Sequence, residues 1–425
     1  MRAGRSGLWR HPDFLKLWTG QTVSLLGSQV SLLALPLTAA LTLKASAAQM
    51  GVLQAVEYAP WLLVTLFAGV WVDRARRRPI LIGADLGRAA ALAIIPVAAS
   101  LHVLRIDYLY GAAFLVGLCT VLFSVAYNAF LPSLIPRERL VEGNGKLSTS
   151  QSVAAIAGPG LGGALVQLIT APLAIAVDAA SFGVSVLSLA LIRTPEPVPA
   201  PPAQRQGVWR DIGDGLRFVR DTPLQRAIVG SAATLNLCLS IANAVYVLYV
   251  TRTLHVSPVI LGVIYASAGP GGLLGAVASA HLSRRCGAGP TILGAVTLLG
   301  GAQVIVPLAG GSPATVAALL SAAGFVGGCA GVVYDVGTVS VQQAITPEHL
   351  LGRMNASTRF ILVGIAPVGF LVGGALGQVI GLRPTLLVGG VGTVLAALWV
   401  VFSPLRTLRD ALPAADRAGA GPTPA

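Results

Sequence analysis

Residues 69–78 read GVWVDRARRR, a run in which an apolar stretch ends abruptly in five charged side chains. Apolar stretches flank this run at residues 48–71 and 79–101, and the same alternation continues along all 425 residues. Only 11% of the side chains are charged, against roughly 25% in soluble domains, and the mean hydropathy is +0.78. A soluble fold of this size cannot bury so much apolar surface, and a disordered chain needs low hydrophobicity. The composition therefore indicates a polytopic membrane protein and excludes a soluble enzyme.

Twelve apolar stretches approach or exceed the ~20 helical residues that cross a bilayer. A shift of 211 residues aligns pieces of the first six with pieces of the last six, for example Gly162–Leu165 with Gly373–Leu376. Both copies then keep the same orientation. The predicted fold is an all-α membrane protein with twelve transmembrane helices in two parallel six-helix halves. The predicted spans are residues 17–42, 48–71, 79–101, 108–132, 146–169, 172–192, 227–250, 258–281, 290–309, 314–340, 355–380 and 384–403.

The two halves are expected at residues 1–192 and 227–404, with a cytoplasmic tail at residues 405–425. The linker of residues 193–226 begins with five prolines in residues 193–206, which are typical of a stiff, extended connector. Apolar residues then recur at helical spacing with arginines between them, which predicts a short basic helix. This helix is expected either on the inner membrane face or in solvent. Its apolar residues are Trp209, Ile212, Leu216 and Val219.

The basic residues predict how the helices are oriented. The formal net charge is +13, and most of the 29 Lys and Arg side chains lie in short loops. With the termini on one side of the membrane, 23 of them fall on that side and four on the other. Both termini are therefore expected in the cytoplasm, and nucleic-acid binding is not expected because no basic face is formed. The four cysteines include no C-x-x-C pair, so no metal site or cofactor is predicted.

The run at residues 69–78 has the spacing G-x-x-x-D-R-x-x-R-R, and it resembles the signature that members of the major facilitator superfamily carry between helices 2 and 3. The family often has glycine at the position of Ala75. The resemblance implies that Asp73 and the arginines gate the cytoplasmic side by charge pairing and by facing a helix N-terminus, where the dipole favours a carboxylate. Alternatively, the arginines only anchor the topology. The signature residues are Gly69, Asp73, Arg74, Arg77 and Arg78.

A second signature lies in the fifth apolar stretch and resembles the G-P-x-x-G-G sequence that exporters of this superfamily carry in helix 5. Small residues permit close helix approach and proline bends a helix, so plain packing is the alternative role. Further stretches, such as FLKLW at residues 14–18 and IPRERL at residues 135–140, resemble the branch of enterobactin exporters and macrolide-efflux proteins. The resemblance implies export and leaves the substrate open. The residues of the second signature are Gly158, Pro159, Gly162 and Gly163.

Several charged side chains fall within predicted helices, where exposure to lipid is costly. Glu57 lies near the middle of its stretch with no basic residue within one turn, so it is the best candidate for binding a proton or a substrate cation. The alternative is a neutral acid bonded to a backbone carbonyl. Asp85 and Arg88 stand at i and i+3, which favours a structural ion pair over a proton relay. Asp178 is expected to stabilise the fold through hydrogen bonds.

Asp335 and Arg359 are the remaining candidates for proton coupling. Asp335 lies toward the cytoplasmic end of residues 314–340. Arg359 is expected in the first turn of residues 355–380, from where it could reach Asp335 or Asp73 and serve as a gate residue.

Polar residues in other stretches give weaker indications of a substrate cavity. The superfamily's cavity is lined mainly by helices 1, 4, 7 and 10, and the resemblance implies apolar walls with a few amides and phenols. Such walls would suit a bulky amphipathic substrate, and interhelical hydrogen bonding is the alternative role for each residue. The candidates are Gln29, Asn128, Asn236, Asn243, Tyr246 and Tyr334.

Together these observations predict a secondary active transporter whose halves rock between inward-facing and outward-facing states. The expected activity is proton-coupled efflux of a small amphipathic molecule (a drug, siderophore or secondary metabolite) by a monomer that contacts membrane lipid. The alternatives are a nutrient uptake permease and a non-transporting membrane scaffold or receptor. No P-loop sequence is present, so ATP hydrolysis is not expected. The excess of arginine over lysine is typical of a GC-rich bacterial genome, which predicts the inner membrane as the location.

Overall fold

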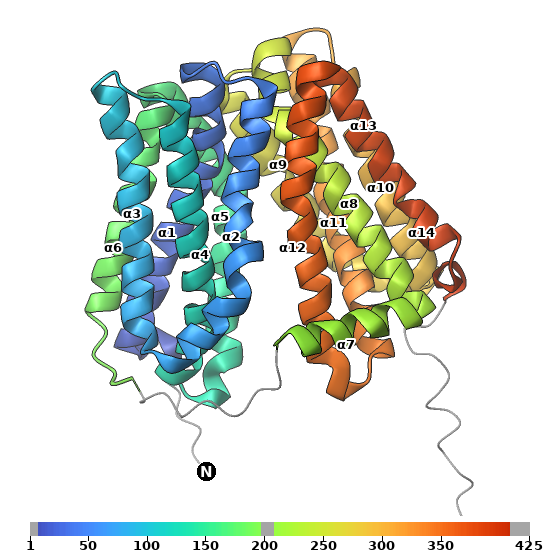
Figure 1. Ribbon diagram of the computed structural model, residues 1–425, viewed down its shortest axis with the longest axis horizontal. Coiled ribbons are helices and arrows are strands. Elements are labelled where there is room, and N and C mark those ends of the chain that lie inside the picture. Colours follow the sequence, from blue (N-terminus) through green and yellow to red (C-terminus); the bar gives the residue numbers. More distant parts are fainter. Residues whose placement is uncertain (1–6, 197–207, 409–425) are drawn as a thin grey trace, which may run out of the picture. The chain divides into compact units, whose positions relative to one another are not determined.

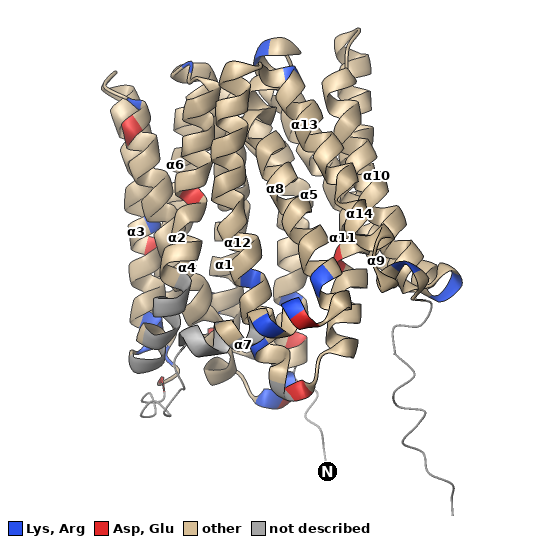
Figure 2. Cartoon of the chain, turned by 45° about the vertical axis from the view of Figure 1, so that its right-hand side comes forward, with Lys and Arg blue, Asp and Glu red and all other residues tan. Residues whose placement is uncertain are grey.

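A computed structural model describes residues 7–196 and 208–408, with the side chains of 65–70, 73–74, 208–212, 214–215 and 349 excepted. The described chain is helical throughout (Figure 1). Among the described residues, eleven helical spans are long and apolar enough to cross a membrane, and α2 adds a helix of 28 residues. Charged residues are sparse along these helices and gather toward their ends (Figure 2). The predicted all-α, polytopic membrane fold is confirmed.

The helices follow one another with short connections. The first group is α1 (Pro12–Leu37), continued by the π-helical turn η2 (Thr38–Thr42), then α2 (Ala47–Arg74), α3 (Arg77–Ser100), α4 (Ile106–Leu134), α5 (Leu140–Ile169) and α6 (Ala171–Ala190). Two short 3₁₀ helices, η1 (Leu8–Arg10) and η3 (Arg137–Arg139), precede α1 and α5. The second group is α7 (Val208–Asp221), α8 (Pro223–Leu248) with η4 (Tyr249–Thr253), α9 (Pro258–Cys286), α10 (Ala288–Leu308), α11 (Pro313–Ile345), α12 (Glu348–Val379), α13 (Leu382–Leu395), α14 (Ala397–Val401) and η5 (Pro404–Thr407).

Each predicted stretch matches one helical span, but several helices begin earlier in polar sequence. Helix α5 begins at Leu140 rather than at residue 146, and α12 begins at Glu348 rather than at residue 355. Hydropathy marks only the part of a helix that lies in hydrocarbon, and polar residues continue the helix beyond it. Arg359 therefore lies about three turns inside α12, and its predicted place in the first turn was wrong.

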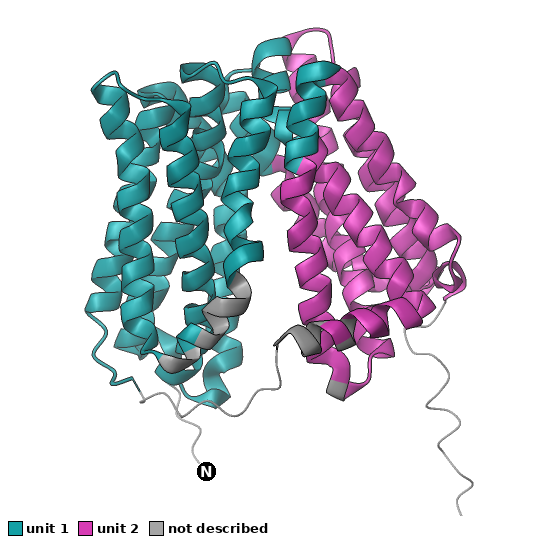
Figure 3. Cartoon of the chain, in the orientation of Figure 1, with its two compact units in different colours: residues 1–205, 243–266, 370–382 teal, residues 206–242, 267–369, 383–425 magenta. Residues whose placement is uncertain are grey.

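The chain divides into two compact units (Figure 3). Unit 1 comprises residues 1–205, 243–266 and 370–382. Unit 2 comprises residues 206–242, 267–369 and 383–425. Because α8, α9 and α12 each contribute to both units, this division differs from the two halves expected along the sequence.

Within unit 1, α1 packs against α5 and α6, α3 packs against α4 and α6, and α2 packs on α4. Side chains from these helices form an apolar core that includes Phe14, Leu81 and Phe130. Within unit 2, α10 packs on α11 and contacts α14 and η5. The core of unit 2 includes Ile292 and Val400.

Two glycine contacts in unit 1 join helices from the two sequence halves. A Cβ atom on Gly51 of α2 would lie 2.8 Å from the Cα atom of Gly374 in α12. A Cβ atom on Gly163 of α5 would lie 3.1 Å from the Cα atom of Gly262 in α9. Only glycine permits such close backbone approach. The 211-residue shift relates Gly51 to Gly262 and Gly163 to Gly374, so the two contacts are equivalent under the internal repeat.

We expect Gly51→Ala to force α2 and α12 apart and to lower stability by about 1–3 kcal/mol, as overpacking does. The measurement is the thermal midpoint of the purified protein in detergent. Gly83→Ala in α3 is the matched control, because no atom lies within 4 Å of a Cβ placed there, and it should leave the midpoint unchanged or raise it. Equal midpoints for the two variants would contradict the close contact.

Candidate functional site

The charged run of residues 69–78 forms the junction between α2 and α3. Helix α2 ends at Arg74 and α3 begins at Arg77, so only Ala75 and Arg76 lie between the two helices. Gly69, Asp73 and Arg74 belong to α2, and their side chains lie outside the described residues. The pairing expected for Asp73 therefore stays a prediction.

A carboxylate that no sequence motif identifies caps the start of α3. The backbone N–H groups of Arg77 and Arg78 donate to Glu196 Oε1 and Oε2, at 2.5 and 3.1 Å. The Arg77 guanidinium lies 3.9 Å from the same carboxylate, which is only 7% exposed. A carboxylate at this place binds N–H groups that lack a partner within the helix, and it is also favoured by the helix dipole.

Hydrogen bonds from α3 and α1 hold the end of α6 and the segment that follows it. Arg78 donates from Nε and Nη2 to the carbonyl groups of Leu189 and Ala190, at 2.8 and 2.5 Å. On α1, Asp13 Oδ2 accepts hydrogen bonds from the backbone of Arg193 at 3.1 Å and from the backbone and hydroxyl of Thr194 at 2.8 and 2.7 Å. The start of the proline-rich linker is therefore docked. The only sequence signal for this docking is an acidic residue between two prolines, Glu196.

Asp85 and Arg88 of α3 form a buried ion pair, in which Arg88 Nη2 donates to Asp85 Oδ1. The Asp85 side chain is 0% exposed and that of Arg88 is 9% exposed. The guanidinium lies over the rings of Phe123 in α4 and Phe182 in α6, at 4.4 and 4.3 Å from their centroids. The two aromatic rings stabilise this cation away from water. The pair and its two rings therefore connect α3, α4 and α6 of unit 1.

Asp178 of α6 extends the polar cluster toward α1. Ser181 Oγ donates to Asp178 Oδ1 at 3.1 Å, and both residues are buried. A Cβ atom on Gly27 of α1 would collide with these two oxygen atoms. Nearby, Gln21 Nε2 donates to Ser185 Oγ at 3.4 Å. Small and polar residues thus line a hydrogen-bonded contact between α1 and α6.

Glu57 has a different environment. Among the described residues of unit 1, no salt bridge or hydrogen bond involves its carboxyl group. Glu57 lies ten residues after the start of α2, which places it ~15 Å along the helix axis. Its backbone carbonyl lies against Gly117 of α4. The ring of the next residue, Tyr58, lies 5.2 Å from that of Phe370 in α12.

The predicted cavity residues differ in their surroundings. Tyr334 is buried in the core of unit 2, where its hydroxyl donates to Ser231 Oγ at 3.1 Å. Tyr246 packs edge-on against Tyr265, with ring centroids 5.7 Å apart. The three asparagines have accessible side chains, and Asn236 is the least exposed of them. They are Asn128, Asn236 and Asn243.

The glycines of the helix 5 signature bring α5 close to other helices of unit 1. A Cβ atom on Gly158 would collide with the side chain of Gln29 in α1, another predicted cavity residue. A Cβ atom on Gly162 would lie 3.1 Å from the Cα atom of Val30. The carbonyl group of Pro159 lies against Gly262 of α9. Close packing is therefore one role that this signature fulfils.

Asp335 and Arg359, the two candidates in unit 2, have exposed side chains on α11 and α12. The carbonyl group of Asp335 accepts a hydrogen bond from Thr338 Oγ1 at 3.1 Å.

The arrangement matches a known family. A model of the Major Facilitator Superfamily matches residues 17–361. The chain belongs to this superfamily. It is therefore a multi-pass membrane transporter and not an enzyme, and the resemblance found in its motifs is confirmed.

Relatives of this transporter include named efflux proteins. The chain is 30% identical to the multidrug efflux pump Tap of Mycolicibacterium fortuitum, over 81% of this chain and 84% of the relative. It is 24% identical to macrolide efflux protein A of Streptococcus pyogenes, over 93% and 96% of the two chains. It is 25% identical to the enterobactin exporter EntS of Citrobacter koseri, over 96% of each chain.

Solved structures share the fold. The inward-facing state of a bacterial homologue of the iron transporter ferroportin has a TM-score of 0.74 at 18% identity, covering 93% of this chain and 99% of that chain. A variant of the nucleoside transporter NupG has a TM-score of 0.76 at 14% identity, covering 92% and 99%. Likeness at this level of identity concerns the fold alone.

We expect Asp85→Asn to be strongly destabilising, by about 3–5 kcal/mol, because it leaves the Arg88 charge buried without its partner. Replacement of both residues, as Asp85→Leu with Arg88→Met, removes both charges and should cost less than the single change. Thermal unfolding of the purified variants measures the difference. A double variant less stable than Asp85→Asn would contradict the structural role of the pair.

We expect Glu196→Ala to weaken the start of α3 by about 1 kcal/mol, the usual value of an N-terminal cap. Amide hydrogen exchange in a peptide covering residues 76–82 should then become roughly fivefold faster. Glu138→Ala is the control, since Glu138 is exposed in η3. Unchanged exchange in Glu196→Ala would show that this carboxylate does not cap the helix.

Proposed function

We propose that this transporter exports a small amphipathic molecule, such as a drug, a siderophore or another secondary metabolite, in exchange for protons. The observation that carries the proton coupling is the Glu57 carboxyl, which has no ion-pair partner among the described residues of unit 1. An ionisable group in the middle of a membrane helix is costly and is kept where it has a function. The names of the relatives, two of them efflux proteins and one an exporter, support the direction.

The carboxyl groups of Glu57, Asp85 and Asp178, all within membrane helices of unit 1, differ in their partners. Asp85 pairs with the Arg88 guanidinium, and Asp178 accepts a hydrogen bond from Ser181, so both carboxyl groups stabilise the packing of unit 1. Glu57 can gain and lose a proton without breaking such contacts. In the proposed cycle, a proton from outside binds Glu57, the substrate leaves to the outside, and the proton is released inside after the conformational change. Asp335 and Arg359 are retained as weaker candidates.

We propose alternating access by rocking of the two six-helix halves. In unit 1, the contacts Gly51–Gly374 and Gly163–Gly262 connect these halves near one end of the helices, and such contacts would have to part when that end opens. The α2–α3 junction lies at the end of α2 opposite to Gly51, and we propose that this arginine-rich junction and both termini lie in the cytoplasm of a bacterial cell. The cavity residues named from the sequence, other than the buried Tyr334, would then face the substrate of a monomeric transporter.

We expect Glu57→Gln to abolish proton-coupled export, because the amide cannot release a proton, while substrate binding persists. The measurement uses everted membrane vesicles that carry a pH-sensitive dye and a standing proton gradient. Addition of a transported siderophore or drug should collapse the gradient in wild-type vesicles and leave it intact in Glu57→Gln vesicles.

Asp107→Asn provides a matched control, since Asp107 is an exposed carboxylate in the first turn of α4. It should behave like the wild type. Full gradient collapse by Glu57→Gln would remove Glu57 from the coupling mechanism. Uphill export that persists after the proton gradient is dissipated would remove proton antiport as a whole.

A further inference from the structure

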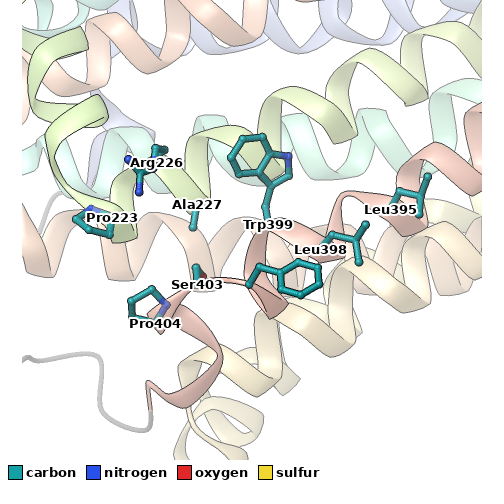
Figure 4. Close-up of a pocket in the computed structure, with 9 residues that line it drawn as sticks. Pro223, Arg226, Ala227, Leu395, Leu398, Trp399, Ser403 and Pro404 are labelled. Carbon is teal, nitrogen blue, oxygen red and sulfur yellow. The ribbon is translucent and has the colours of Figure 1, made fainter.

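A pocket of about 430 Å³ lies in unit 2, between the start of α8 and the end of the last membrane helix. Arg226 and Ala227 of α8 form one wall, and Leu398 and Trp399 of α14 form the other. Figure 4 shows Arg226 and Pro223 on one side and Leu395 and Leu398 on the other, with Trp399 between them. The pocket thus combines a cation with an apolar surface.

The cationic wall has unused binding capacity. Arg226 is exposed and is the fourth residue of α8, which begins at Pro223. Its Nη1 atom is 3.5 Å from the carbonyl oxygen of Arg220. No carboxylate among the described residues forms a salt bridge with it. A guanidinium has five N–H donors in a planar fork that matches a phosphate group.

The apolar wall is exposed although it is made of large hydrophobic side chains. Phe402 is 83% exposed, and Leu395 and Leu398 are 50% and 44% exposed. In a membrane protein, such side chains near the end of a transmembrane helix contact acyl chains. This wall extends the membrane-facing surface of α13 and α14 to the level of Arg226.

Trp399 is held in a defined position between the two walls. Its ring lies so close to Gly230 that a Cβ atom there would be 2.7 Å from the ring. Its Nε1 atom donates to Thr234 Oγ1 at 3.1 Å. Gly230 is one helical turn beyond Arg226, so the indole covers the same face of α8 one turn deeper. Tryptophan favours the boundary between headgroups and acyl chains, because its ring is apolar and its N–H is polar.

We propose that this pocket binds an anionic phospholipid, with the phosphate on Arg226 and the beginning of the acyl chains over Leu398, Trp399 and Phe402. Helix α8 begins and α14 ends at this pocket, and the ends of membrane-spanning helices are where a bilayer's headgroups are expected. The positive charge of Arg226, which pairs with no carboxylate among the described residues, favours a headgroup with net negative charge over a zwitterionic one. The exposed Arg406 of η5 adds to the positive potential of this edge, whereas Arg220 before α8 is paired with Asp221 at 2.9 Å.

The test compares phosphatidylglycerol with phosphatidylcholine of identical acyl chains, added to the full-length protein in detergent. Native mass spectrometry counts bound lipid, and the thermal midpoint measures the stabilisation that binding produces. The wild type should bind phosphatidylglycerol more tightly than phosphatidylcholine. Arg226→Gln should weaken phosphatidylglycerol binding roughly fivefold, the effect of one interfacial charge, whereas Arg226→Lys should retain most of the preference.

Arg137→Gln is the matched control, because Arg137 is an exposed arginine of η3 in unit 1, and it should bind like the wild type. Phe402→Ser should weaken both lipids, since it removes acyl-chain contact and leaves the charge. Equal phosphatidylglycerol affinity in the wild type and Arg226→Gln would overturn the proposal. Displacement of the lipid by millimolar inorganic phosphate, with the same stabilisation, would overturn it too and make the pocket a site for free anions. Neither result bears on proton coupling at Glu57.

Discussion

A charge inside a bilayer has no water to bind, so the protein itself must supply its partner. The helices of unit 1 are arranged around that requirement. The Asp85–Arg88 pair brings together α3, α4 and α6, because the guanidinium needs both its carboxylate and the rings of Phe123 and Phe182. Asp178 then draws α6 onto α1, where Gly27 leaves room for its oxygen atom. The cluster sets the relative positions of four helices, and Glu57 stands out because it takes no part in this arrangement.

The sequence predicted the membrane helices well because the bilayer is a strong and simple constraint. A stretch of about 20 apolar residues has no other stable location, and each predicted stretch became a helical span. The helix ends were predicted poorly, as Arg359 illustrates, because outside the hydrocarbon a polar helix and a polar loop have similar hydropathy. The sequence also paired Asp85 with Arg88 from spacing alone, since residues three apart on a helix are neighbours.

Other parts of the site depend on contacts that spacing does not reveal. Glu196 caps α3 although α4, α5 and α6 separate the two in the sequence, so no local pattern identifies this cap. The burial of Tyr334 against Ser231 follows from packing in unit 2, whereas its polarity alone suggested a cavity. The helix 5 signature predicted close approach, but the partners of its glycines appeared only with the tertiary structure.

The two glycine contacts of unit 1 also bear on how such a chain could have arisen. The second helix of each sequence half meets the fifth helix of the other half. Gly51 contacts Gly374, and their counterparts in the repeat, Gly262 and Gly163, contact each other in the same way. This reciprocity is the mark of an isologous interface, the kind that two identical subunits form about a two-fold axis. A single polypeptide of 425 residues thus keeps the contact pattern of a homodimer of six-helix proteins, and its proline-rich linker occupies the place where two separate chains would have been joined.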